Sequence, residues 1–446
     1  MPEVKEIPIV VAAFNKVRSL SRLLSSLNTA HYSVSPIKLI ISVDGGGNVE
    51  VRRVAQEFQW SHGEKEVIIH PENLGLRKHI LYCGSLSQLY SGILLLEDDL
   101  LVSPCFYNYA LQVVSAYNHE EQVCGMALYS PCYNETSYMP FHPLNDGSDG
   151  YFMQLPCSWG QIWLKEHWIQ FSKWYEENQH LDLSADMALP HNIRLWPETS
   201  WKKYFAKYML TKEQYFFYPY NSFTTNFGES GQHHTGTHLF QVPLSLDIKA
   251  MKFVDFKESQ VKYDSFCEIQ PECLKRLCSR LENYDFDVDL HGTKEKEHLN
   301  SKYVITSKKS EQPILTFGKT LLPIENNLIH CVEGSVISFS ENTLVEDIED
   351  MNVCVWLKSN DFSELCYYYP LDKRHIARLT KKLEISKIEN HQLKEKKHQL
   401  QTKTDDLLHL LTAARNENSA LRDSYSFKIG QMIITPFSYL KNLIWR

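Results

Sequence analysis

The sequence has no long uninterrupted hydrophobic run. Nowhere in its 446 residues do about 18 apolar side chains follow one another, the minimum that a membrane-spanning helix needs. Residues 1–6 also lack the charged-then-apolar pattern of a secretion signal. We therefore expect no transmembrane helix and a protein that stays in the cytoplasm.

The sequence also lacks cysteines at paired spacings. The 11 cysteines are odd in number and scattered, and no two of them form a C-x-x-C pair. The spacing of Cys267, Cys273 and Cys278 suits neither a zinc ribbon nor a small disulfide framework. The sequence therefore predicts reduced thiols that are mostly buried.

The chain has no overall excess of basic residues, since its net charge is −8. Residues 371–446 carry 15 Lys and Arg against 8 Asp and Glu, a net charge of +7, which leaves −15 on the rest. An acidic body argues against nucleic acid as a partner. The basic tail suits the anionic inner face of a membrane, where peripheral contact is the expectation.

The first hundred residues alternate strand and helix patterns. Short apolar runs at residues 9–13, 37–43, 66–69 and 93–96 are typical of strands buried on both faces. Leucines at helical spacing lie between the first two runs. We therefore predict an α/β domain over residues 1–250, with a mostly parallel sheet and helices on both faces. In such a sheet, ligands bind at the carboxyl ends of the strands.

Polar side chains follow these strands. Asn15 comes after the first strand, Asp44 after the second, and Glu97, Asp98 and Asp99 close the fourth. Adjacent carboxylates repel each other unless a cation lies among them. A hard divalent ion with oxygen ligands, Mn²⁺ or Mg²⁺, is a suitable partner that would also bind a diphosphate. A solvated acidic turn is the alternative interpretation.

The remainder of the chain divides into three further segments. Short strand patterns at residues 303–306, 314–317 and 336–339 predict a small accessory α+β domain over residues 251–370. Residues 424–446 are amphipathic. They suit either a helix lying in a membrane interface or a helix that caps the protein's own core.

Residues 371–423 carry a heptad repeat. Leucines occupy most positions of one seam, and Asn390 and Asn418 lie in the other. Asparagines at such positions favour two parallel strands in register. We predict a coiled coil that makes a homodimer, with a single solvated helix as the alternative.

Four short stretches mark the strand ends: Ile9-Val10-Val11-Ala12-Ala13-Phe14-Asn15-Lys16, Ser42-Val43-Asp44-Gly45, Asn73-Leu74-Gly75-Leu76-Arg77 and Leu96-Glu97-Asp98-Asp99-Leu100. In this order they resemble the nucleotide-binding half of the family-2-type, GT-A-fold glycosyltransferases. The Glu-Asp-Asp form is similar to that of the medial-Golgi N-acetylglucosaminyltransferase group and its bacterial relatives. Trp159-Gly160 and Asn226-Phe227-Gly228-Glu229 resemble the acceptor-side half of bacterial polysaccharide-type members.

The resemblance implies an inverting, Mn²⁺- or Mg²⁺-dependent hexosyl- or N-acetylhexosaminyltransferase. It would move a sugar from a nucleotide-sugar donor to a glycan or glycolipid acceptor. The implied donor-side roles are Asp99 for the metal, Asp44 for the nucleobase, Asp98 for the ribose, Glu97 for the donor sugar, Ala13 and Phe14 for the nucleotide pocket, and Arg77 for the base or diphosphate. Alternatively, Asp44 has no ligand role and simply begins a Gly-rich turn, and Arg77 lies on the surface.

Inversion at the sugar carbon needs a general base beside the acceptor hydroxyl. Relatives often place an Asp directly after a Ser-Trp pair, but this chain has Lys202 there. A lysine is a poor base unless it is strongly desolvated. The candidates for the base are Glu198 first, Glu229 second and Asp186 third.

Trp159 and Trp201 are candidates to stack on the acceptor's sugar rings, although packing in the core would account for either tryptophan equally well. Two rival functions also remain open. A sugar-nucleotide nucleotidyltransferase would need a Gly-rich turn after the first strand to cradle a triphosphate, and residues 11–17 contain no glycine. A catalytically degenerate scaffold is supported by Lys202 and opposed by the intact acidic triplet.

Overall fold

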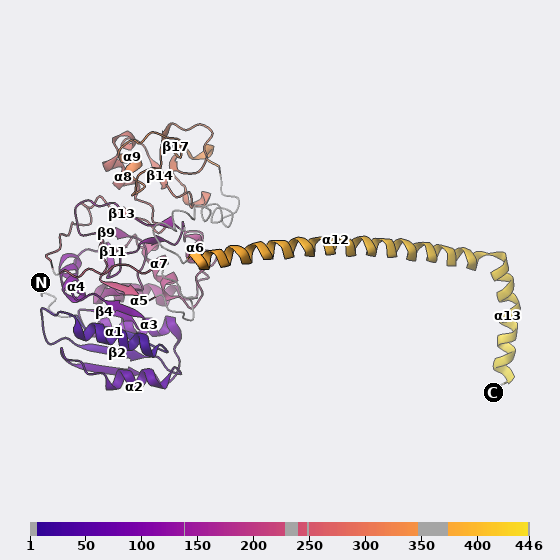
Figure 1. Cartoon of the computed structure of the whole chain (residues 1–446), viewed down its shortest axis with the longest axis horizontal. Coiled ribbons are helices and arrows are strands. Elements are labelled where there is room, and N and C mark those ends of the chain that lie inside the picture. Colours follow the sequence, from indigo (N-terminus) through magenta and orange to yellow (C-terminus); the bar gives the residue numbers. More distant parts are fainter. Residues whose placement is uncertain (1–6, 138, 228–239, 248, 347–372, 445–446) are drawn as a thin grey trace. The chain divides into compact units, whose positions relative to one another are not determined.

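The computed structural model describes residues 7–137, 139–227, 240–247, 249–346 and 373–444. Contacts divide the chain into two compact units, Met1–Tyr368 and Tyr369–Arg446 (Figure 1). Within the described ranges, no helix combines the length and the apolar character that crossing a membrane requires.

A large mixed sheet forms the centre of the first unit. Within the described residues it has nine strands in the order β13-β9-β11-β6-β10-β4-β1-β2-β3, and β4, β1, β2 and β3 are mutually parallel. The strands are β1 Ile9–Ala13, β2 Leu39–Val43, β3 Lys65–Ile69, β4 Gly92–Glu97, β6 Val123–Ala127, β9 Gly150–Met153, β10 Gln161–Leu164, β11 Tyr215–Pro219 and β13 Lys262–Tyr263. The predicted α/β class with a mostly parallel sheet is confirmed.

Helices cover both faces of this sheet. They are α1 Val17–Thr29, α2 Val49–Glu57, α3 Gly75–Ser85, α4 Phe106–Tyr117, α5 Lys165–Asn178, α6 His191–Arg194 and α7 Trp201–Thr211, with a 3-10 turn, η1, at Leu86–Leu89. Successive strand residues point to opposite faces. Val11 therefore packs in one core cluster with residues of α1, α2 and α4, and Val10 in the other with residues of α3, α5 and α7. Burial on both faces explains why β1, β2 and β4 are continuously apolar. Strand β3 was also predicted to be buried, but it lies at the edge of the sheet and is only partly buried.

Two short strand pairs lie outside the main sheet. Strand β5 (Leu100–Val102) directly follows the acidic triplet and pairs antiparallel with β12 (Thr224–Asn226). Strands β7 (Tyr133–Asn134) and β8 (Met139–Pro140) form a small antiparallel hairpin.

A second, smaller sheet follows in the order β14-β15-β17-β16. Its elements are α8 Pro271–Leu277, η2 Ser279–Leu281, β14 Phe286–Asp289, η3 Lys296–His298, β15 Tyr303–Thr306, β16 Leu315–Phe317, α9 Asn326–Ile329, β17 Ile337–Glu341 and η4 Asn342–Leu344. The three strand patterns read from the sequence in this region correspond to β15, β16 and β17. Strand β13 also lies beyond residue 250, but it extends the main sheet.

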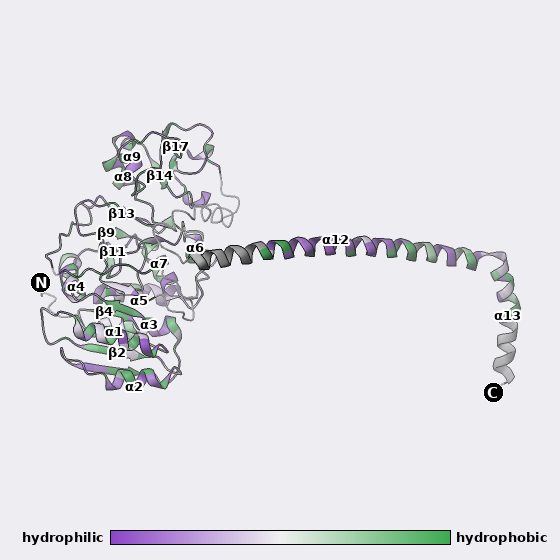
Figure 2. Ribbon diagram, in the orientation of Figure 1, coloured by the Kyte–Doolittle hydropathy of each residue, from purple (hydrophilic) through white to green (hydrophobic). Residues whose placement is uncertain are grey.

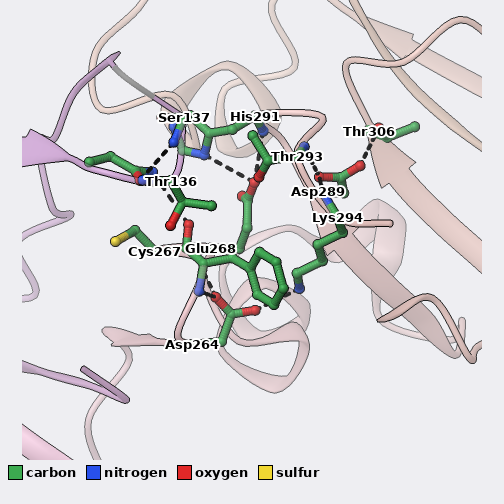
Figure 3. Close-up of polar contacts among 12 residues, drawn as sticks. Thr136, Ser137, Asp264, Cys267, Glu268, Asp289, His291, Thr293, Lys294 and Thr306 are labelled. Atoms are coloured by element: carbon green, nitrogen blue, oxygen red, sulfur yellow. Dashed lines mark hydrogen bonds and ion pairs between the residues drawn. The ribbon is translucent and has the colours of Figure 1, made fainter. Parts of the chain in front are cut away.

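A buried ionic network joins the small sheet to the loop that follows β13 (Figure 3). Lys294 lies 2.6 Å from the Asp264 carboxylate, and Glu268 accepts hydrogen bonds from the backbone N–H and the ring Nδ1 of His291 at 2.8 and 3.0 Å. Glu268 is fully buried. A buried charge is costly unless it is paired, so these contacts hold the loop in one place relative to the small sheet.

The second unit consists of two helices, α12 (Lys373–Asp423) and α13 (Tyr425–Ile444). Ser424 separates them, and its hydroxyl accepts a hydrogen bond from the Phe427 backbone N–H at 3.3 Å, as at a helix N-cap. All side chains described in α12, from residue 385 onward, are exposed. Figure 2 shows hydrophobic residues recurring along an otherwise hydrophilic α12.

Candidate functional site

The loops after the parallel strands pack directly on one another at the carboxyl edge of the sheet. After β1, the Phe14 backbone N–H donates to Asp98 Oδ2 at 3.1 Å, which ties the first loop to the acidic triplet. After β2, a Cβ added to Gly45 would lie 2.2 Å from the Glu72 backbone in the loop after β3. Only glycine permits so close an approach. The strand ends therefore form one continuous surface.

Three consecutive carboxylates form the centre of this edge. Burial, then the negative charges of Asp99 and Asp98, raise the pKa of Glu97 to about 8, and Lys202 and Lys16 partly offset this rise. The Lys16 ammonium lies 2.8 Å from Asp99 Oδ2. At neutral pH, Glu97 therefore keeps its proton unless a further cation lies beside the triplet.

Asp99 leaves one ligand position open. Its Oδ1 is buried and has no hydrogen-bond partner among the described residues. The same residues contain no group of three or more His, Cys, Asp or Glu side chains arranged to hold an ion. The described residues therefore build no closed metal cage by themselves. It fits the open type of site, in which one or two carboxylates and the substrate's phosphates share the ion.

Asp44 is buried and already bonded to the backbone. Its carboxylate accepts from the N–H groups of Gly45 and Leu74, both at 2.8 Å, and of Gly75 at 3.1 Å. These bonds use three of its roughly four acceptor positions. Asp44 therefore ties the loop after β2 to the start of α3, as in the alternative interpretation, and its contact with a nucleobase stays a prediction.

The other donor-side residues line or flank the same edge. Ala13 is 2% exposed at the end of β1. Phe14 is half-buried against Gly47, where an added Cβ would lie 2.9 Å from the phenyl ring. The Arg77 guanidinium lies 5.0 Å from the centre of the Tyr204 ring, so Arg77 packs against α7.

An aromatic pocket lies beside the triplet. The space between its walls, open solvent included, is about 560 Å³. Two of its wall residues, Lys202 and Cys157, interact electrostatically with Glu97. The lining residues are Tyr129, Pro131, Tyr133, Glu135, Thr136, Met153, Leu155, Pro156, Cys157, Ser158, Trp159, Asn192, Trp196, Lys202, Tyr218, Phe240 and Cys267.

The two tryptophans singled out in the sequence lie in different surroundings. Trp159 lines the pocket, with the Lys202 ammonium 5.8 Å from its ring centre. Trp201 is 2% exposed and packs edge-on against Trp163, with ring centres 5.2 Å apart. Trp201 therefore belongs to the core beneath α7, which was the alternative interpretation for both residues.

The two candidate bases that the structure describes, Glu198 and Asp186, lie outside the pocket lining. Glu198 pairs with Lys203 at 2.8 Å and its side chain is 59% exposed, while Asp186 pairs with Lys207 at 2.7 Å. Neither carboxylate lines the pocket. Glu229 lies outside the described residues.

Three residues of this region were not found from the sequence. Lys16 is the last residue of the first motif, but it was given no role because no acidic partner is near it in the sequence. Glu135 lines the pocket from the turn between β7 and β8, and Trp196 lines it from the turn after α6. Both elements are too short to show a hydrophobic periodicity in the sequence.

Of the comparisons with known proteins, only the one with solved structures found similar proteins. No family model matches the chain, and no curated protein matches its sequence significantly. The solved structure of mouse xyloside xylosyltransferase 1 in its apo form is 12% identical over 47% of this chain and 84% of that chain, with a TM-score of 0.30.

Two structures of S. aureus TarS 1–349 are also similar. The complex with UDP-GlcNAc is 10% identical over 51% of this chain and 60% of that chain, with a TM-score of 0.35. The complex with UDP is 9% identical over 49% and 59%, with a TM-score of 0.33. At these identities and TM-scores, the assignment of a function depends on the geometry of the site.

Proposed function

We propose that the chain is an inverting glycosyltransferase that moves a sugar from a nucleotide-diphosphate sugar to a glycan or glycolipid acceptor. One observation carries the proposal. A carboxylate triplet with an unpartnered buried oxygen on Asp99 lies beside an aromatic pocket, and Lys202 of the pocket wall interacts electrostatically with Glu97. Sugar transfer needs such a pair of sites, one for an anionic leaving group and one for a sugar ring.

The donor side is built for a diphosphate. A divalent ion, Mn²⁺ or Mg²⁺, bound by Asp99 and the donor's phosphates would stabilise the charge on the leaving nucleotide diphosphate. The chain's own residues hold this arrangement: the Phe14 N–H fixes Asp98 for the ribose, and Lys16 neutralises part of the triplet. Glu97 would hydrogen-bond the donor sugar.

The acceptor side suits a sugar. Trp159 and Trp196 line the pocket, and aromatic rings pack well on the apolar faces of sugars while leaving hydroxyls free to bond. The Lys202 ammonium lies 4.7 Å from the Trp196 ring centre and supplies hydrogen-bond donors at the boundary with the triplet. The pocket therefore recognises a hydroxyl-bearing ring beside the donor.

The proposal is tested by incubating the full chain with a panel of nucleotide sugars, with and without Mn²⁺. A true donor at 100 times its Kd should stabilise the fold by about 2.7 kcal/mol, seen as a rise in Tm that requires the ion. Release of nucleotide diphosphate is measured in parallel. If no nucleotide sugar raises Tm in Mn²⁺, the proposed function is wrong.

A second candidate function, a degenerate scaffold, is favoured by one specific observation. The Lys16 ammonium already pairs with Oδ2 of Asp99, the residue proposed to bind the metal. A scaffold of this kind predicts that Mn²⁺ changes neither Tm nor nucleotide release. The same panel of nucleotide sugars therefore separates the two functions.

We also propose that α12 pairs with α12 of a second copy as a parallel coiled coil. The seam leucines Leu393, Leu400 and Leu407 are each more than 60% exposed in the single chain. A helix with a continuous apolar seam gains stability by burying it against a partner. The tail of α13, where Met432 and Ile433 are exposed, remains a prediction for contact with a membrane surface.

Charges beside the seam favour the parallel orientation. With Leu393 at position d, a parallel pair brings Glu389 to Lys394 of the second copy and Glu417 to Arg422 of the second copy. In an antiparallel pair, e positions face one another. Four of these positions are basic and none is acidic: Lys387, Lys394, Arg415 and Arg422.

The coil is tested on the full chain by light scattering. We expect a dimer for the wild type and a monomer for Leu393→Asp combined with Leu400→Asp, because two buried seam positions become charged. His391→Asp with His398→Asp, on the outer face, is the matched control and should stay dimeric. An Asn390→Cys variant should form an intermolecular disulfide, because facing seam residues meet only in a parallel, in-register pair. A monomeric wild type would exclude the coil.

A further inference from the structure

Glu135 is the pocket residue that the proposed function has not yet used. It lies in the turn of the β7–β8 hairpin, and its half-buried side chain lines the pocket together with Trp159 and Lys202. Among the described lining residues it is the one carboxylate. The pocket therefore places an acidic side chain where an acceptor would bind.

The backbone on both sides of Glu135 is held by buried hydrogen bonds. Asn134 Oδ1 accepts from the backbone N–H of Thr136 at 2.9 Å and of Ser137 at 3.1 Å. The Thr136 hydroxyl donates to Asn192 Oδ1 at 3.0 Å. A group that takes a proton must be fixed within a fraction of an ångström of its partner. These bonds fix the backbone of the turn that carries Glu135, which limits the positions that its carboxylate can reach.

The same turn rests on the loop that the small sheet anchors. Asn134 Nδ2 donates to the Phe266 carbonyl at 3.3 Å, directly before Cys267 and Glu268. Figure 3 shows Thr136 and Ser137 beside Cys267 and Glu268. That loop is itself held to the small sheet by the ion pairs of Asp264 and Glu268. The small sheet therefore helps to position Glu135.

The Glu135 carboxylate is free to act. Within the described residues it has neither an ion pair nor a hydrogen bond, whereas Glu198 is paired with Lys203 and Asp186 with Lys207. A carboxylate already paired with an ammonium gains less by taking a proton. Of the acidic candidates placed by the structure, Glu135 is the one both unpaired and in the pocket.

Burial makes the thiols and a tyrosine of the pocket wall reluctant to lose their protons. Burial raises the pKa of Cys157 to about 12. Burial, followed by the charges of Asp264 and Glu135, also raises the pKa of Cys267 well above its ordinary value. Burial likewise raises the pKa of Tyr218 well above its ordinary value. Glu135 is therefore the one carboxylate available as a base on the described walls.

We propose that Glu135 is the general base of the transfer, an assignment that rests on the proposed function. As the acceptor oxygen forms its bond to the anomeric carbon, its proton passes to Glu135 Oε. The bond from that carbon to the diphosphate oxygen breaks at the same time, and its electron pair leaves with the nucleotide diphosphate. Inversion follows because the acceptor attacks from the face opposite the leaving group.

The test uses the full chain, the donor found in the nucleotide-sugar panel, Mn²⁺ and a panel of aryl glycosides as acceptors. We expect Glu135→Gln to lower transfer about 100- to 10,000-fold, the usual contribution of a general base. The affinity for nucleotide diphosphate should stay within about twofold of the wild type, and the acid limb of the pH profile of kcat/KM should disappear. Glu135→Asp should retain part of the activity.

The controls separate the possible failures. Glu177→Gln, an exposed residue of α5, is the matched substitution and should leave transfer unchanged. Full transfer by a folded Glu135→Gln variant, or a loss confined to Glu198→Gln, would overturn the assignment while the proposed function stands. A wild type that binds no nucleotide sugar would overturn both.

Discussion

The donor-side edge and the aromatic pocket are assembled from the chain in different ways. The donor-side edge collects a few residues directly after four parallel strands, all within the first hundred positions. The pocket takes its walls from residues 129 to 267 and rests on a loop anchored by the small sheet. We infer that the first region depends on strand topology, and the second on tertiary packing and long-range ion pairs.

The sharpest contrast lies between two tryptophans, because one lines the pocket and the other fills the core. Trp201→Ala should lower the free energy of unfolding by about 3–5 kcal/mol, as removal of a large buried ring usually does. Trp159→Ala should cost much less stability and instead raise the KM for the acceptor. Chemical denaturation and acceptor titrations measure the two effects. Equal losses of stability in the two variants would contradict the assignment of Trp159 to the pocket wall and of Trp201 to the core.

On the donor side, Asp99→Asn is the decisive substitution. It removes the carboxylate charge proposed to hold the ion, so we expect metal-dependent turnover to fall about 100-fold or more, equivalent to about 2.7 kcal/mol. Asp285→Asn, at an exposed position before β14, is the matched control. Unchanged turnover in Asp99→Asn would mean that Lys16, not a metal, compensates the triplet.

The packing of the strand-end loops is tested by adding one methyl group. Gly45→Ala places a Cβ against the Glu72 backbone, so we expect a loss of about 1–3 kcal/mol in stability together with weaker donor binding. Gly430→Ala meets nothing within 4 Å and is the control. Thermal unfolding and nucleotide titration measure both. If donor affinity survives in Gly45→Ala, the loop after β2 does not shape the donor site.

Much of the fold was predictable because its signals are local. The four strands before residue 100, the strands of the small sheet near 303, 315 and 337, and the helix over the heptads were all read from apolar runs and periodicity. The domain limits were harder to read. Strand β13 lies beyond residue 250 and still pairs with β9, and no local pattern announces a pairing across more than a hundred residues.

The candidate site shows the same division. The acidic triplet was found because a buried strand runs straight into it. The pairing of Asp99 with Lys16 was not found, since 83 positions separate the two residues. Trp159 and Trp201 look alike in an aromatic stretch, and only burial distinguishes wall from core.

By itself, the sequence determined where strands, helices and the acidic triplet occur, because hydrophobic periodicity and consecutive charges act over a few residues. Tertiary structure alone decided which carboxylate remains unpaired in the pocket. Pairing depends on which distant lysine reaches which acid, and that choice is made only when the chain has folded around both.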